Sequence, residues 1–259
     1  MSLVAKDPVA SEAGHWYTIN GTPMYTVLSS KGVERNTTLR DARALNLVPS
    51  VTTILNVAAK PGLIRWLQQQ VLLAALTLPK QDNEPEEEYI DRILKDSKEE
   101  GKAAADAGTD IHAVLQNYYE KPNDPCPMPE LAMGFESTLN EHFGEQEWIC
   151  ERSFAHSLGF GGKVDMHSKG GNIVVDIKTK NFTDPKQVAG YDEHLMQLAA
   201  YRVGLGMQTA RCANVFVSRN MVGLYVVKEW TDEELRKGWK MFYNLLQFWQ
   251  VKNNYEPKL

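Results

Sequence analysis

The sequence predicts an α/β fold in which helices flank a mixed central sheet. Two observations lead to this prediction. From residue 109 onward, the spacing of apolar residues changes in the order helix, three strands, helix and strand. The second and third of these strands are separated by Gly170-Gly171, a pair typical of a tight hairpin turn. A meander of three strands followed by a helical crossover gives a sheet with both antiparallel and parallel neighbours.

The first hundred residues are expected to form a hairpin and then helices. Asn20-Gly21 lies between alternating apolar residues, which indicates a turn. Ser50 can cap a short helix, and Pro61 occupies a favoured first helical position. The predicted elements are a hairpin over 14–28, a helix from the Ser50 cap through Asn56, a helix over 62–78, an acidic loop over 79–88, and a long helix to Tyr119 that could break near Gly101 or Gly108.

The remaining elements follow from helical spacing, alternation and capping signals. Thr231 and Glu234 form a capping-box pattern that opens a final helix rich in aromatic residues. The predicted elements are a helix over 130–143, strands over 147–156, 160–168 and 172–179, a helix over 193–206 capped at Asp192, strands over 212–218 and 222–229, and the final helix, whose Trp239, Phe242, Tyr243, Phe248 and Trp249 are expected in the core.

Composition limits the possible classes of protein. The chain has 259 residues, 43% hydrophobic and 24% charged, which is ordinary for a globular protein. No apolar run approaches the roughly 20 residues of a membrane span, and no signal peptide is evident. Three scattered cysteines favour reduced thiols in a cytoplasmic setting. We expect an N-terminal hairpin and helical region over 1–105, packed on a core over 106–259 that ends in the final helix.

The most informative residues surround the predicted hairpin. If Gly170 and Gly171 form its two-residue turn, Asp165 lies directly opposite Asp176. Opposed carboxylates destabilise a sheet, so a cation between them is expected, and oxygen ligands suit Mg²⁺ or Mn²⁺. Lys178 leaves the same face two residues later. The alternative is an ordinary surface hairpin, and the assumed register also opposes two lysines, Lys163 and Lys178.

Three further residues lie at helical positions. His112 follows Gly108-Thr109 at the edge of an apolar helical stripe, where a lone histidine is more often structural. Gln197 and Tyr201 are four residues apart and project from one face of the later helix. Taken alone, each of these patterns is common in surfaces and cores.

Four short motifs follow one another in the order of the predicted elements. They are Gly108-Thr109-x-x-His112, Gly162-x-x-Asp165, Asp176-x-Lys178 and Gln197-x-x-x-Tyr201. This order resembles the PD-(D/E)xK nuclease superfamily in its RecB-type branch, which includes stand-alone phage and bacterial exonucleases and the mitochondrial genome maintenance exonuclease. The resemblance implies a restriction-endonuclease-like sheet with a core of helix, three strands, helix and strand. It covers residues 108–201 and leaves the first hundred without a matching motif.

The resemblance also implies roles for the matching residues. Asp165, Asp176 and the backbone carbonyl of Ile177 would bind Mg²⁺ or Mn²⁺, with His112 completing the shell. Lys178 would position the attacking water and stabilise the charge that develops on the phosphate. Gln197 and Tyr201 would orient the DNA strand. An acidic residue on the preceding strand, Glu151, would belong near the site. Apart from the resemblance, nearby cations can supply phosphate contacts, and for about half of them the alternative is an ordinary solvated surface position. They are Arg152, Lys163, Lys180, Lys186 and Arg202.

The expected function is that of a metal-dependent deoxyribonuclease, an exonuclease acting on DNA ends or single strands in phage or bacterial recombination, repair or DNA processing. Three scattered cysteines cannot hold the four-cysteine iron-sulfur cluster of some relatives, and no nucleotide-binding loop is present, so neither a cluster nor ATP is expected. Net charge is -5, so DNA would bind through a local basic groove. The alternatives are a structure-specific endonuclease for flaps or junctions, a non-catalytic DNA-binding domain, and an unrelated protein with a purely structural hairpin.

Overall fold

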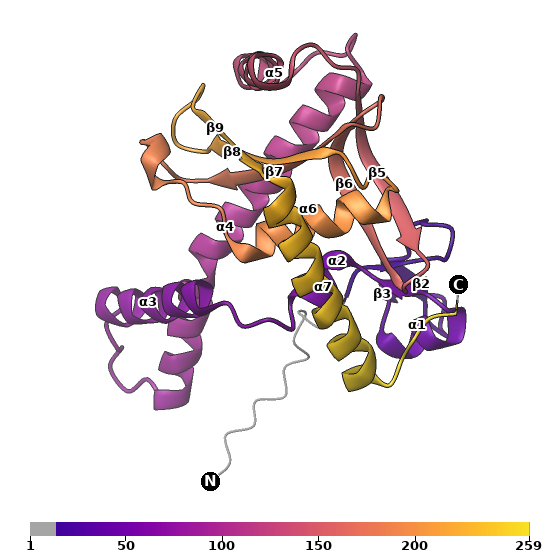
Figure 1. The fold of residues 1–259 in the computed structure, drawn as a ribbon. Coiled ribbons are helices and arrows are strands. Elements are labelled where there is room, and N and C mark those ends of the chain that lie inside the picture. Colours follow the sequence, from indigo (N-terminus) through magenta and orange to yellow (C-terminus); the bar gives the residue numbers. More distant parts are fainter. Residues whose placement is uncertain (1–13, 259) are drawn as a thin grey trace.

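A five-stranded mixed sheet forms the centre of the molecule (Figure 1). The computed structural model describes residues 14–258, apart from the side chain of Glu100. The strand order is β5-β6-β7-β8-β9, with β7 and β8 parallel and the other neighbours antiparallel. This is the predicted α/β arrangement of a meander and a helical crossover. The strands are β5 Trp148–His156, β6 Phe160–Ser168, β7 Ile173–Lys180, β8 Arg211–Ser218 and β9 Tyr225–Trp230.

The helices begin and end close to the predicted residues. Ser50 accepts a hydrogen bond from the backbone N–H of Thr53 and caps α2, as its sequence position predicts. Thr231 and Glu234 form the predicted capping box at the start of α7. The helices are α1 Leu39–Leu45, α2 Val51–Leu55, α3 Pro61–Thr77, α4 Glu86–Glu120, α5 Pro129–Phe143, α6 Asp192–Gly204 and α7 Asp232–Asn253, with a short 3-10 turn, η2, over Pro185–Gln187.

Both faces of the sheet are buried. Helices α6 and α7 cross one face, and α4 and α5 lie on the other (Figure 1). The alternation along β7 divides its side chains between the two faces, which is why the strand carries an almost continuous apolar run. The α6–α7 core contains Trp16, Ile54, Phe154, Phe160, Val164, Val174, Leu198 and Phe242, and the α4–α5 core contains Leu115, Phe135, Cys150, Met166, Ile173, Val175, Ile177 and Val215.

The hairpin between β6 and β7 has the predicted register. Met166 pairs with Val175 and His167 with Val174, which is the pairing that a turn centred on Gly170 and Gly171 produces. The chain reverses through Gly171, which has a φ of 71°, a conformation that favours glycine. Among the described residues, this ladder contains only those two pairs. Beyond these two pairs, on the side away from the turn, the strands separate. Asp165 and Asp176 are the first residues past the end of the ladder.

The expected hairpin over 14–28 forms near its turn, where Tyr17 and Pro23 make an antiparallel bridge and the N–H of Met24 donates to the carbonyl of Trp16 at 2.8 Å. Gly21 lies in this turn at a φ of 82°, and β1, Trp16–Tyr17, also pairs with β4, Val48–Pro49. The second strand of the expected hairpin, β2 Thr26–Leu28, pairs with β3 Glu34–Asn36. Trp16 and Tyr17 are both buried, and Trp16 packs in the α6–α7 core. Burial of these two large rings selects the pairing with β4, which a local turn signal does not contain.

Helix α4 is continuous from Glu86 to Glu120, so the break considered near Gly101 or Gly108 is absent. It therefore passes through residues 105 and 106 without interruption. The α6–α7 core also combines side chains from residues 16–55 with others from residues 154–249. In space, the N-terminal hairpins and α2 share a core with the later helices.

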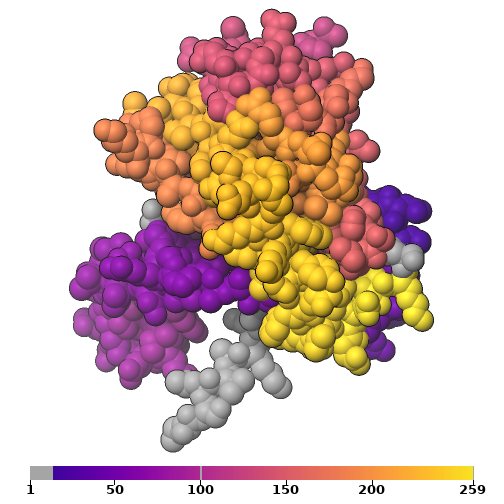
Figure 2. All heavy atoms as spheres, in the orientation of Figure 1, coloured from indigo at the N-terminus to yellow at the C-terminus, as the bar shows by residue number. Residues whose placement is uncertain are grey.

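Helix α3 and the first part of α4 form an arm that extends from the body of the molecule (Figure 2), while the later part of α4 packs on the sheet. Several leucines along α3 are exposed, and Leu76 near its end is 83% exposed. In the final helix, Phe242 and Trp249 are buried as expected, whereas Phe248 is 55% exposed, because it lies on the opposite side of α7. Over residues 14–258, no helix has the length and hydropathy that a membrane crossing requires.

Candidate active site

The candidate site lies where β6 separates from β7. At this fork, the backbone N–H of Ile177 donates to Oδ2 of Asp165 at 2.7 Å. In a continued ladder, a backbone carbonyl of β6 would accept from this N–H. Because the strands have separated, the Asp165 carboxylate is the acceptor instead. In an extended strand the N–H and C=O of one residue point to the same edge, so the carbonyl of Ile177 also faces the fork. Asp165 and this carbonyl are two of the predicted oxygen ligands.

Asp176 is held on the other side of the fork. It is 1% exposed, and its Oδ2 accepts a hydrogen bond from Asn214 Nδ2 at 2.7 Å. Asn214 is its register partner on the parallel strand β8 and in turn accepts from Trp230 Nε1 at 2.8 Å. The ammonium of Lys178 lies 2.7 Å from the same carboxylate oxygen. Both the amide and the ammonium therefore fix the position of Asp176.

A short network continues from β7 to α6. Lys178 Nζ donates to Gln197 Oε1 at 3.0 Å, and Gln197 Nε2 donates to the hydroxyl of Tyr201 at 2.9 Å. Gly162 makes room for this tyrosine, because a Cβ at that position would lie 2.9 Å from the Tyr201 ring. The first residue of the Gly-x-x-Asp motif thus has a packing role, while its Asp165 lies at the fork.

Helix α4 carries His112 to the fork. Its Nδ1 lies 3.7 Å from Oδ1 of Asp165. Gly108, one helical turn earlier, allows this approach, because a Cβ there would lie 2.8 Å from Oγ1 of Thr179 on β7. The spacing of Gly108 and His112 is therefore explained by the close packing of α4 on the strand that carries Asp176.

Glu151 lies on β5 at the position opposite Asp165, between the pairs Cys150–Met166 and Arg152–Val164. Its φ of 52° is unusual for a residue other than glycine, and such backbone strain concentrates at functional sites. The Glu151 carboxylate forms an ion pair with Lys163 on β6. Cys150 and Met166 belong to the α4–α5 core, whereas Phe154 and Val164, farther along the hairpin, belong to the α6–α7 core. The β5–β6 hairpin thus changes the core that it faces at its two carboxylates.

The electrostatics of the fork are those of crowded carboxylates. Burial raises the pKa of Asp165 to about 6, and the nearby Asp176 carboxylate adds to the rise. Burial alone would lower the pKa of Lys178, but the charges of Asp176 and Asp165 outweigh it, so its pKa is raised. Burial followed by the same two carboxylates raises the pKa of Tyr201 well above its ordinary value. The lysine is therefore an ammonium and the tyrosine a neutral hydroxyl at neutral pH.

The donors at the fork fit a hard divalent cation. Two carboxylates and a backbone carbonyl are the ligands that Mg²⁺ and Mn²⁺ prefer, and His112 lies beside them. Within the part of the chain that the structure describes, no three His, Cys, Asp or Glu side chains cluster tightly enough to hold a metal ion by themselves. Instead, Lys178 and Lys163 balance the charges of Asp176 and Glu151. A third ligand would therefore have to come from the backbone, from water or from a shift of His112.

Sequence reasoning missed residues on both sides of the fork. Asn214 and Trp230 position Asp176, and only their location on neighbouring strands shows it. Two N-terminal rings also approach the site: Tyr25 stacks on His15 at 4.5 Å between ring centroids. Desolvation of the His15 ring, followed by the charge of Lys163, lowers the pKa of that histidine. The turn signal at Asn20-Gly21 placed these rings in one hairpin but not beside the site.

The cationic side chains expected to bind phosphate differ in whether they are exposed or already bonded within the protein. Arg202 is buried and donates to Asp232 at 2.8 Å and to the carbonyl of Ala210 at 3.5 Å, so its expected role at the site is wrong. Its position on α6 turns it away from the fork and toward the start of α7. Lys180 Nζ contacts the carbonyl of Gln187 at 3.4 Å, whereas Arg152 and Lys186 are exposed.

No protein-family model matches the chain, and no curated protein matches it in sequence. Fifteen chains among the solved structures resemble it, and three of them show how distant the likeness is. These three are the protein described as SSO0001 (15% identity, 75% of this chain and 87% of that chain, TM-score 0.35), a proposed exonuclease from Eubacterium rectale (16%, 59% and 70%, 0.37), and an alkaline exonuclease from Laribacter hongkongensis (14%, 73% and 97%, 0.35). Likenesses with TM-scores below 0.5 are too distant to assign a function, so the function has to be inferred from the site itself.

Proposed function

We propose that this protein is a Mg²⁺- or Mn²⁺-dependent deoxyribonuclease that acts as an ATP-independent exonuclease. The observation that carries the proposal is the fork itself, where Asp165 and Asp176 meet beside the ammonium of Lys178. Paired carboxylates with an adjacent lysine suit the hydrolysis of a phosphodiester, whose transition state gathers negative charge. The setting would be the recombination, repair or processing of phage or bacterial DNA.

Each residue at the fork has a distinct task in this proposal. Asp165, Asp176 and the Ile177 carbonyl would hold the cation, with His112 beside Asp165. When bound, a divalent cation polarises a phosphoryl oxygen and lowers the pKa of a bound water to about 7. Lys178 donates to a non-bridging phosphate oxygen and keeps its proton, because its pKa is raised.

The residues of α6 orient this lysine. Gln197 accepts from Lys178 Nζ and donates to the neutral hydroxyl of Tyr201, so the lysine has one preferred direction. An oriented donor needs no rearrangement during the reaction, which is the physical basis of electrostatic catalysis. A domain that had lost catalysis would have no need to retain this oriented network, so we favour an enzyme over a binding module.

The test is digestion of end-labelled linear single- and double-stranded DNA beside a closed single-stranded circle. We expect the linear forms to be degraded with Mg²⁺ or Mn²⁺, at equal rates with and without ATP, and to survive in chelator. The closed circle should resist. Rapid cutting of the circle would support the flap or junction endonuclease instead. Binding of DNA without any hydrolysis would support the non-catalytic alternative.

A further inference from the structure

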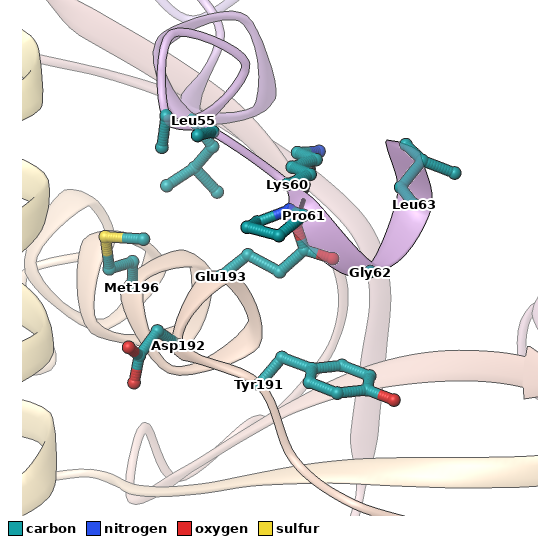
Figure 3. Close-up of a pocket in the computed structure, with 11 residues that line it drawn as sticks. Leu55, Lys60, Pro61, Gly62, Leu63, Tyr191, Asp192, Glu193 and Met196 are labelled. Atoms are coloured by element: carbon teal, nitrogen blue, oxygen red, sulfur yellow. Dashed lines mark ion pairs between the residues drawn. The ribbon is translucent and has the colours of Figure 1, made fainter. Parts of the chain in front are cut away.

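A cavity of about 490 Å³ lies beside the candidate site and is not used by the proposed chemistry (Figure 3). One wall is the segment that joins α2 to α3, and the other is the start of α6. Its volume is within the range of small-ligand pockets. Figure 3 shows Tyr191 and Met196 on the α6 side and Pro61 and Leu63 on the other. The lining residues include Leu55, Lys60, Pro61, Gly62, Tyr191, Asp192, Glu193 and Met196.

This cavity adjoins the catalytic lysine. A second cavity of about 260 Å³ is lined on one side by Lys178, Gln197 and His194 and on the other by Thr52, Leu55 and Asn56. The two cavities share Leu55, Lys60 and Glu193, and Nζ of Lys60 lies 3.3 Å from Oε2 of Glu193. This ion pair therefore lies at the junction between the site of hydrolysis and the larger cavity.

The chemistry of the larger cavity suits a nucleobase and opposes a phosphate. Leu55, Pro61 and Met196 supply apolar surface, and the ring of Tyr191 is 52% exposed. Base faces stack on such rings, while carboxylates accept hydrogen bonds from the amino groups of bases. Two carboxylates, Asp192 and Glu193, would repel a phosphate. The cations near the junction, Lys60 and Lys178, would instead attract the phosphates on the strand leading into it.

We propose that this cavity binds an unpaired nucleobase of the DNA strand, adjacent to the nucleotide whose phosphate meets Lys178. The proposal rests on the proposed nuclease function and extends it to a subsite for one base. Lys60 then contacts the phosphate between the two cavities, in place of its contact with Glu193. Stacking and apolar contact do not select one base, whereas the carboxylates of Asp192 and Glu193 favour bases that carry an amino group.

Gly62 offers a way to fill the cavity. A Cβ at this position would meet no atom within 4 Å, so a larger side chain can enter without displacing the backbone. Gly62→Trp should fill the space, and Tyr191→Leu should remove the stacking ring. The matched control is Leu76→Trp, at the exposed end of the same helix.

The experiment measures binding of single-stranded oligonucleotides to the 259-residue chain in Ca²⁺, which replaces Mg²⁺ to limit turnover. A single abasic residue is moved along the oligonucleotide, one position at a time. In the wild type and Leu76→Trp, we expect one position to weaken binding about tenfold, the scale of one lost base stack. Gly62→Trp and Tyr191→Leu should bind the intact oligonucleotide about tenfold more weakly and show no loss at that position.

Two results would overturn the subsite: no position at which an abasic residue weakens wild-type binding, or an unchanged abasic profile in both variants. A separate Mg²⁺ digestion of the wild type tests the nuclease. Position-dependent binding without hydrolysis would reject the nuclease and retain the subsite. Hydrolysis by the wild type without any position-dependent loss of binding would support the nuclease and reject the subsite. Free deoxyadenosine monophosphate that competes with the oligonucleotide for the wild type, but not for Gly62→Trp, would support base binding in the cavity. It would also indicate that the bound base belongs to the released product.

Discussion

The two strands that meet at the fork hold their carboxylates in different ways. Asp176 on β7 is 1% exposed and has Asn214 and Lys178 as partners. Asp165 on β6 has 18% of its side chain exposed, accepts from one backbone N–H, and faces a strained residue, Glu151, on the next strand. The β7 side is fixed by hydrogen bonds from two neighbouring elements, whereas the β6 side is fixed mainly by the course of the hairpin.

This difference suggests that the two sides of the fork have different roles, one in catalysis and the other in cation binding. Hydrogen bonds to Asp176 and Lys178 preorganise the residues that must not move during reaction. On the β6 side, Asp165, Glu151 and His112 come from three separate elements and have fewer partners within the protein. Small shifts there can adjust ligand distances to a cation. We therefore expect variants on the β7 side to affect catalysis most, and variants on the β6 side to affect cation affinity.

The largest expected effect comes from the β7 side. Asp176→Asn and Lys178→Met should each lower the rate of DNA hydrolysis about a hundredfold or more, the usual result of losing one oriented charge. Lys169→Met, an exposed lysine in the same hairpin, is the control and should keep its activity. Rates on end-labelled linear DNA measure the effect. Wild-type turnover in purified Asp176→Asn would remove Asp176 from the site.

The same residues should matter for stability. Sequence alternation places Asp176 and Lys178 outside the apolar stripe of Ile173, Val175 and Ile177. By itself, this pattern predicts that replacing Asp176 or Lys178 leaves folding intact. The structure corrects this, because the site face is buried as well. Asp176→Ala leaves a largely buried ammonium without its carboxylate, which typically costs about 3 kcal/mol or more. The double variant Asp176→Ala with Lys178→Met lacks this unpaired ammonium. Thermal unfolding should therefore give a lower Tm for Asp176→Ala alone than for the double variant.

The next effect tests the β6 side. His112→Ala should weaken the apparent affinity for Mn²⁺ or Mg²⁺ about ten- to a hundredfold, the scale found for groups that support metal ligands. Activity at saturating cation should fall less, which separates affinity from catalysis. Gln116→Ala, one turn farther along α4, is the control, because the side chain of Gln116 donates to Glu120 on the same helix. An unchanged cation titration for His112→Ala would show that the histidine is structural.

The raised pKa of Asp165 predicts a pH dependence of stability. Its ordinary value is 3.8 and its value here is about 6. Between these values the folded protein binds a proton that the unfolded chain has lost, so the free energy of unfolding falls as pH rises through this window. We expect Tm in chelator to fall more steeply from pH 4 to 6, about the window set by those two pKa values, in the wild type than in Asp165→Asn. Equal slopes would contradict the assignment, and Mn²⁺ should raise Tm most above this window.

The smallest effect concerns the packing of α4 on β7. Gly108→Ala places a Cβ 2.8 Å from Oγ1 of Thr179, so the helix must shift and carry His112 with it. We expect about a tenfold loss of activity, since small misplacements of catalytic groups are costly. Thr179→Ala in the same chain should restore it. Gly101→Ala in the same helix meets its nearest atom at 3.4 Å and should instead stabilise the helix by about 1 kcal/mol.

Local signals determined much of this molecule. Two glycines fixed the register of β6 and β7, and hence the meeting of Asp165 with Asp176. Capping signals at Ser50 and Thr231 located the starts of α2 and α7. These predictions succeed because they depend on hydrogen bonds and turns between residues that are close in the chain.

Only the tertiary structure decided the rest, because it depends on residues that are distant in sequence. The pairing of β1 with β4 follows from burial of Trp16 and Tyr17, and the support of Asp176 by Asn214 depends on the parallel partner of β7. The strain at Glu151 arises where one hairpin changes from one core to the other. The cavity beside Lys60 requires α2, α3 and α6 to meet, and no periodicity along one segment contains that information.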